Sequence, residues 1–454
     1  MTLEQIADIR GLPVTAPAPE AVERLDALID DIYYYRVGVQ DRVAALLEDY
    51  PEFGLAHIVL AYSLLTEGTL DVEAKARARL HQSEKLPATR RERLHQEALR
   101  AWIAGDLEAR AAAWESILNE WPTDLLAFRQ YTATLFWSGD KRHQAEVTAG
   151  LANRWNANVP GYGHFLSAHA FAMEEVGRYA LAERSARDAL AIQPQDLWAL
   201  HALAHVLEMQ GRVGEGIAML SDAAAYLNDY NLFRGHLWWH LSLFLVTAGR
   251  FDEALELFDH EIYPKESTFY LDIQNGASLL ARLEFQGMDV GAARWERLAQ
   301  ASLAVATRCT LWFTAMHHVM ALAQSGRIAA ARSALEYLAS AGGRSPQAAL
   351  AHDLGLAALA YCEDRPADAL GRFLALRQRH GELGASHAQQ DLYEQVAVMA
   401  AFRLGDLARV RQLLKARLNT RVWDAASWQA FLDCANELDG PVDEAAVRAA
   451  LRWA

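Results

Sequence analysis

Apolar and polar positions alternate along this chain with the period of a helix. Ala, Leu, Glu and Arg dominate nearly all of the sequence, and runs of alternating Val, Ile and Thr are missing. Only 12 prolines interrupt the pattern. We therefore predict helix almost throughout. The exception is the N-terminus, residues 1–24, where Pro13, Pro17 and Pro19 indicate an extended arm.

Small residues and glycines divide the helical pattern into units of about 34 residues. The segment from Gly177 to Pro194 has the residue pattern of a tetratricopeptide repeat. It has a glycine in the turn, an aromatic at Tyr179 and alanines where two helices cross. The next unit begins at Leu197 in the same register. Weaker copies extend in both directions, giving about nine or ten helical pairs. The sequence predicts an all-α fold in which residues 25–454 form a single tetratricopeptide-type α-solenoid, curved into a superhelix.

Two pairs of histidines stand out from this background. His201 and His205 lie in HALAH, and His236 and His240 lie in HLWWH. Residues four apart share one face of a helix, so each pair directs two imidazoles the same way. The repeat register places all four on the first helix of their units, which lines the concave, ligand-binding face of a solenoid. We therefore take these histidines as the main candidates for a site.

Other polar residues fall on the same predicted wall. Glu208 lies on the helix of His201 and His205, and Trp239 is expected to form part of the groove wall. Upstream and downstream units supply further candidates. In GASHAQQD, His387 and Asp391 could interact and reach the same pocket, or Ser386 could cap a helix with one of them completing the cap. The additional candidates are Glu175, His164, Asp272, Asn275 and His317.

Charge and composition exclude several classes of function. The formal charge is −15 without a basic run, which argues against nucleic acid and anionic membranes as partners. Three distant cysteines indicate a reducing compartment. The first residues lack a signal peptide, and no apolar run approaches the roughly 18 residues of a membrane span. We expect a cytoplasmic protein. Phosphate-loop, GxSxG, CxxC and GxGxxG motifs are absent from the sequence.

Seven blocks of the sequence resemble the tetratricopeptide repeat protein 38 family, in order, from about Leu25 to about Asn419. The resemblance implies an all-helical repeat fold and a cytosolic protein, and it brings no biochemical activity with it. Ala385 and Gln390 depart from the family pattern, which has Gly and Arg at these positions. The blocks are RERLHQEALRAWIAGD, EWPTDLLAF, FAMEEVGRY, WALHALAHVLEMQGR, HLWWHLSL, LDIQNGASLLARLEFQG and GASHAQQDLY.

Three interpretations of the histidines remain open. They could be structural, with hydrogen bonds that hold the stack together. They could donate hydrogen bonds to a small acid or to a peptide end in a concave pocket lined by His and Glu. They could hold a divalent metal, Zn or Fe, with Glu175 or Glu208 completing the ligands. We expect ligand binding, with a metal-dependent hydrolase as the alternative and a protein-interaction scaffold as the third class.

Overall fold

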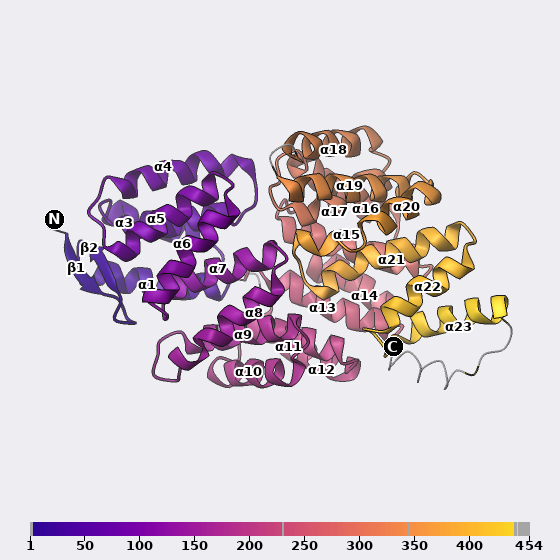
Figure 1. Cartoon of the computed structure of the whole chain (residues 1–454), viewed down its shortest axis with the longest axis horizontal. Helices are drawn as coiled ribbons and strands as arrows, with labels where there is room; N and C mark the ends of the chain where they lie inside the picture. Colours follow the sequence, from indigo (N-terminus) through magenta and orange to yellow (C-terminus); the bar gives the residue numbers. More distant parts are fainter. Residues whose placement is uncertain (1–2, 229–230, 343–344, 440–442, 444–454) are drawn as a thin grey trace. The chain divides into compact units, whose positions relative to one another are not determined.

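The computed structural model describes residues 3–228, 231–342, 345–439 and 443. In this part of the chain, 23 α-helices follow one another with a single two-stranded sheet at the N-terminus (Figure 1). The fold is an all-α solenoid, as predicted. The residues group into two compact units, and the division falls inside helix α11, between Leu203 and Ala204. The expectation of a single solenoid over residues 25–454 stays a prediction.

Unit 1 contains residues 1–203 and 228–233. Its elements are β1 (Glu4–Ala7), β2 (Pro13–Ala16), α1 (Pro19–Tyr33), α2 (Val39–Asp49), α3 (Gly54–Leu65), α4 (Glu73–Glu84), α5 (Arg90–Ile103), α6 (Leu107–Glu120), α7 (Leu125–Trp137), α8 (Lys141–Leu151), α9 (Tyr162–Glu175), α10 (Tyr179–Ile192) and the start of α11 (Leu197–Met209), with short helical turns η1 (Leu70–Val72) and η2 (Ala152–Arg154).

Unit 2 contains residues 204–227 and 234–454. Its elements are the end of α11, α12 (Val213–Asp222), α13 (Arg234–Thr247), α14 (Phe251–Leu257), α15 (Tyr270–Phe285), α16 (Ala292–Val305), α17 (Ala315–Gln324), α18 (Ile328–Gly342), α19 (Pro346–Cys362), α20 (Pro366–Leu376), α21 (His387–Arg403), α22 (Leu407–Leu418) and α23 (Ala425–Asp439), with short turns η3 (Ala223–Tyr226), η4 (Phe258–Ile262), η5 (Trp312–Thr314) and η6 (His380–Leu383).

The N-terminal segment differs from the extended arm expected for residues 1–24. β1 and β2 form an antiparallel hairpin in which Ile6 pairs with Val14, and α1 begins at Pro19. Long-range contacts hold the hairpin against α5: Asp8 forms an ion pair with Arg91 at 3.2 Å, and Thr15 donates to Glu92 through both its backbone and its hydroxyl. These partners lie about 80 residues away in sequence, so local patterning gave no indication of them.

The predicted repeat boundaries agree with the helices. α11 begins at Leu197, the predicted start of its unit, and its Ala204 is fully buried. Gly211, in the turn after α11, has φ +68°, a left-handed conformation that favours glycine. On α12, a Cβ at Gly216 would lie 2.3 Å from the Phe244 ring. Small residues therefore occur where neighbouring helices approach closely.

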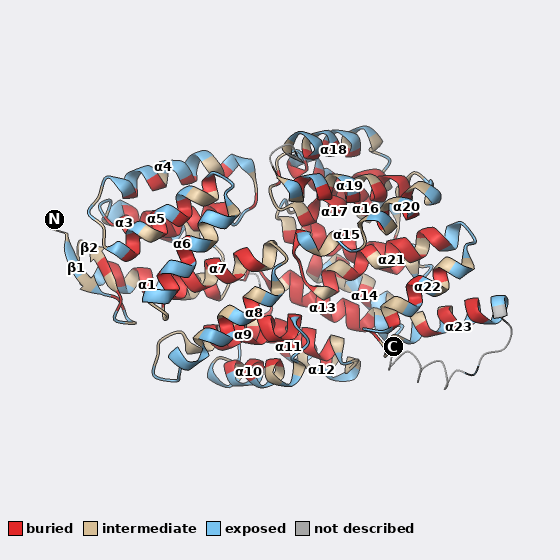
Figure 2. Cartoon of the chain, viewed as in Figure 1, coloured by how far each residue is buried: buried red, intermediate tan, exposed pale blue. Residues whose placement is uncertain are grey.

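The first helices of the hairpins in unit 2 form its interior. α13, α15 and α17 are buried along most of their length, whereas α18 and α20 expose one face (Figure 2). α15 packs against α13, α17 and α21. A helix that is buried all round has no solvent-facing stripe on which polar side chains can keep their hydrogen bonds to water. Polar side chains on these helices therefore require partners within the protein or a ligand.

Candidate functional site

Two helices of unit 2 bring three of the predicted histidines together. His205 lies on α11, and His236 and His240 lie one turn apart on α13. The ring centroids of His205 and His240 are 4.6 Å apart, and those of His236 and His240 are 4.8 Å apart. All three side chains are at most 3% exposed. We use the name interior cluster for these three histidines together with Glu208, Trp239 and Asn275.

Glu208 connects the histidines to the C-terminal part of unit 2. Its Oε1 accepts a hydrogen bond from Arg421 at 2.9 Å, and its Oε2 lies 3.6 Å from Nδ1 of His240. Burial alone would raise the pKa of this carboxyl group, but the charge of Arg421 and the contact with His240 outweigh it and hold the pKa well below its usual range. Glu208 is therefore ionised in the folded protein at neutral pH.

His236 and His240 are neutral at neutral pH. Burial lowers the pKa of His236 well below its ordinary value and that of His240 to about 4. Exposed imidazoles would titrate near pH 6.5 and could make the site positive. These two do not, because their rings are shielded from water and lie beside one another. Positive charge in this interior comes from arginines.

Sequence reasoning missed these arginines. Arg421, in the loop between α22 and α23, contacts Glu208 and also lies 3.4 Å from Asp391. Arg417, at the end of α22, donates to the two carboxylate oxygens of Asp391 at 2.8 and 2.9 Å. Arg282 lies on α15 and is 3% exposed. A lone arginine in the apolar run LLARLEF was the one available signal for Arg282.

His387 and Asp391, the candidates predicted in the late repeat, are linked to the interior cluster through arginines. Asp391 forms ion pairs with Arg417 and Arg421. The backbone carbonyl of His387 accepts a hydrogen bond from Arg421 at 3.5 Å. Ser386 caps α21 as proposed, but the residue that completes the cap is Gln389 and not His387 or Asp391. Ala385, where the resembling family has Gly, adopts φ +69°.

Asn275, Trp239 and His317 also lie in the interior of unit 2. Asn275 Oδ1 is 2.9 Å from Nδ1 of His236, and the Trp239 ring stacks on the same imidazole with centroids 5.0 Å apart. His317, on α17, has its pKa lowered to about 3 by burial and by the charges of His318 and Arg282. Asp272 lies at the start of α15, where it accepts a hydrogen bond from the Ser267 hydroxyl at 2.7 Å.

The other predicted residues belong to unit 1. Glu175 forms an ion pair with Lys141 at 2.6 Å. The His164 ring stacks on Tyr33 at 4.5 Å, and its Nε2 lies 3.4 Å from the Asp30 carboxylate. The ring of His201 lies among aromatic side chains of the same unit, with centroid distances of 4.7–5.2 Å to Trp198, Phe233 and Phe171.

Metal ligation in unit 2 would depend on few atoms. Ring nitrogens of His205 and His240 lie within 4.8 Å of one another, and neutral imidazoles are suitable ligands for Zn or Fe. The carboxylate of Glu208, which lies 3.6 Å from His240 Nδ1, is engaged by Arg421. The donor set therefore fits a metal only in part.

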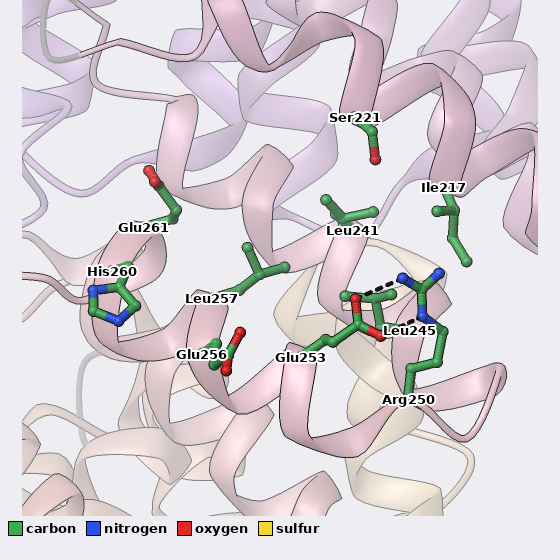
Figure 3. Close-up of a pocket in the computed structure, with 10 residues that line it drawn as sticks. All are labelled: Ile217, Ser221, Leu241, Leu245, Arg250, Glu253, Glu256, Leu257, His260 and Glu261. Carbon is green, nitrogen blue, oxygen red and sulfur yellow. Dashed lines mark hydrogen bonds and ion pairs between the residues drawn. The ribbon is translucent and has the colours of Figure 1, made fainter.

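A pocket of about 260 Å³ lies elsewhere on unit 2 (Figure 3). The exposed ion pair of Arg250 and Glu253 lies at one end, and His260 lies at the other. None of the residues predicted from the sequence lines this pocket. The lining residues are Ile217, Ser221, Leu241, Leu245, Arg250, Glu253, Glu256, Leu257, His260 and Glu261.

The sequence matches no protein-family model. Among solved structures, similarity is found to the human IFIT1 dimer with m7Gppp-AAAA, at 13% identity over 94% of each chain and a TM-score of 0.36. Naa15/Naa10 bound to HypK-THB is similar at 12% identity over 94% of this chain and 68% of that chain, with a TM-score of 0.26. At these values the likeness carries no argument about a ligand or partner.

The helices therefore define the class of this protein: it is an all-α helical repeat protein. None of the helices in the described part of the chain is both long and apolar enough to cross a lipid bilayer.

Proposed function

We propose that unit 2 binds a small polar ligand among the side chains of the interior cluster. The observation that carries the proposal is the meeting of His205, His236 and His240 with Glu208 in a fully buried interior. The first helices of repeat units commonly carry ligand contacts. A small molecule or a peptide end with hydrogen-bonding groups matches the chemistry of these side chains.

Energetic reasoning favours a ligand over a purely structural role. Apolar side chains of similar volume would fill the same space without desolvating a carboxylate and two guanidinium groups. Neighbouring helices of unit 2 pack largely through apolar side chains, as at Ala331 and Leu335 on α18. Stacking therefore does not require a histidine cluster, and ligand binding supplies a reason for it.

A metal-holding site is the second candidate, favoured by the short separation of the His205 and His240 nitrogens. Arg421 opposes it, because a cation would have to share Glu208 with a guanidinium group. Zn or Fe bound there would also require a further ligand.

The decisive experiment compares the full-length protein with a His205→Ala, His240→Ala double variant. Native mass spectrometry and thermal-shift screening against small polar molecules report ligand binding, and elemental analysis reports metal. We expect the wild type to bind a ligand and the double variant not to. His57→Ala is the matched control, because it removes a buried histidine of unit 1 that contacts the Pro51 carbonyl at 2.9 Å.

Two outcomes would contradict the proposal. Near-stoichiometric Zn or Fe in the wild type, lost in the double variant, would favour the metal site. A wild type that binds nothing, with a double variant that melts far below it, would make the histidines structural. The prediction against nucleic acid rests on the net charge of −15 alone, so RNA oligonucleotides belong in the same screen.

We also infer membership of the tetratricopeptide repeat protein 38 family from the seven sequence blocks. Two observations support it. The block WALHALAHVLEMQGR coincides with one complete first helix and its glycine turn. The departure at Ala385 lies where the backbone adopts a conformation that favours the glycine of the family pattern.

A further inference from the structure

Arg282 differs from the other two interior arginines in its partners. Arg417 and Arg421 form ion pairs with Asp391 and Glu208. The Arg282 guanidinium meets neutral oxygens: the hydroxyl and carbonyl of Ser278, and the carbonyl of Ala388 at 2.7 Å. Among the residues that the structure describes, no carboxylate lies within ion-pair distance of it. One buried positive charge is therefore without a counter-ion in contact.

The hydrogen bonds of Arg282 to described residues do not use its Nε–H. A guanidinium has five N–H groups. Nη1 donates to Ser278 and Nη2 donates to Ala388, so the Nε–H has no acceptor in the described part of the chain. The Nε–H together with a neighbouring Nη–H is the fork by which a guanidinium binds both oxygens of a carboxylate.

Three neighbouring side chains also have buried donors without acceptors. Nε1 of Trp239, Nε2 of Gln274 and Nδ2 of Asn275 make no hydrogen bond to any described residue. Each of these side chains is at most 1% exposed. Buried donors without partners are uncommon in folded proteins and cost stability. Several of them beside an unmatched positive charge indicate a missing acceptor that is negatively charged.

Helix periodicity places Gln274 and Arg282 on one face of α15. Ser278 lies between them, four residues from each. Side chains on a helix lean toward its N-terminus, and Arg282 reaches back to Ser278 in this way. Trp239, on the neighbouring α13, faces the Arg282 guanidinium at 5.6 Å from the ring centroid. Asn275 contacts His236 of the cluster.

We propose that the ligand of the interior cluster carries a carboxylate, which Arg282 binds bidentately while Trp239, Gln274 and Asn275 donate further hydrogen bonds. The inference rests on the proposed function, because it names the ligand class of the same site. Arg282 contacts no carboxylate of the described residues, and one guanidinium matches the charge of a monoanion better than that of a dianion such as phosphate. The carboxylate comes either from a small organic acid or from the C-terminus of a peptide.

The test measures affinity by calorimetry and thermal shift on the full-length protein. The probes are acetate, benzoate, inorganic phosphate, and one short peptide prepared both as the free acid and as the C-terminal amide. We expect a carboxylate probe to bind and to be weakened about tenfold or more by Arg282→Lys, which keeps the charge but loses the planar fork. Trp239→Phe removes the N–H, keeps an aromatic ring and should weaken binding severalfold.

Arg91→Lys provides the matched control, because Arg91 is an equally buried arginine of unit 1 and should leave the affinity unchanged. Preference for the free-acid peptide over its amide and over small acids identifies a peptide end as the source.

Three results would overturn the inference: no carboxylate probe binds, phosphate binds in preference, or both the Arg282→Lys and Trp239→Phe variants bind as the wild type does. If a polar ligand still binds and is lost in the His205→Ala, His240→Ala variant, the proposed function stands without its carboxylate.

Discussion

Arg421 donates a hydrogen bond to Glu208 at 2.9 Å, although 213 residues separate the two in sequence. Both side chains are nearly buried, with 6% and 8% of their surface exposed. Next to this pair, the Trp423 indole donates to the Met209 carbonyl at 3.2 Å, and the space of a Cβ at Gly211 is occupied by the Trp423 ring. The loop after α22 therefore joins the end of α11, and the last hairpins of unit 2 meet its first.

The ion pair of Arg421 and Glu208 should show a large coupling energy in the free energy of unfolding. Arg421→Met leaves the buried Glu208 carboxylate without its guanidinium and should lower the free energy of unfolding by about 3–5 kcal/mol. Glu208→Gln should cost less, because Arg421 keeps the Asp391 carboxylate at 3.4 Å. The double variant should lose much less than the sum of the two. Urea denaturation of the four proteins measures the coupling. Strictly additive losses would show that the two charges are screened from each other.

Ala204→Leu should damage folding and leave the binding chemistry intact. Ala204 is fully buried where helices approach, and a larger side chain there should cost about 1–3 kcal/mol. Thermal unfolding would show the lower stability, and the affinity of the fraction that remains folded should match the wild type. Ala218→Leu, at an exposed position of α12, is the control and should change the melting temperature little.

Ionisation of Asp272 should lower the free energy of unfolding as the pH rises from about 4 to 6. Burial raises the pKa of this carboxyl group to about 6, against 3.8 for the ordinary group, and the Ser267 hydrogen bond opposes the shift only in part. The protonated form is favoured in the folded state, so its contribution is complete below pH 3.8 and lost as pH passes 6. The loss is on the order of 3 kcal/mol.

Asp272→Asn should therefore stabilise the protein at pH 7.5 and change it little at pH 4, because the amide does not ionise and its oxygen can still accept from Ser267. Denaturation curves at several pH values test this. The same substitution at Asp252, an exposed residue of α14, is the control. An Asp272→Asn variant with the same pH dependence as the wild type would contradict the argument.

Ala385→Gly should stabilise the protein by roughly 0.5–1 kcal/mol. Ala385 is fully buried with φ +69°, where a Cβ is strained by about 1–2 kcal/mol. Glycine relieves this strain, although the greater freedom of the unfolded chain offsets part of the gain. Asp364→Gly, at φ +55°, should gain less because Asp tolerates this conformation better. Equal effects at both positions would argue against the strain at Ala385.

Much of the fold follows from local sequence. Helix formation depends on the apolar period and on glycine in the turns, so the start of α11 at Leu197 and the turn at Gly211 were predictable. The shared face of His236 and His240 follows from helix geometry alone. These features depend on residues a few positions apart, and the sequence contains that information directly.

The tertiary structure decided which distant side chains meet and which of them carry charge. Arg421 reaches Glu208, Arg282 reaches the Ala388 carbonyl, and Arg91 of α5 forms an ion pair with Asp8 of the N-terminal hairpin. The same packing removes water from His240, so burial lowers its pKa to about 4 and leaves the ring neutral. Solvation and charge pairing depend on all the elements around a group, whereas the periodicity of one helix specifies only the face on which it lies.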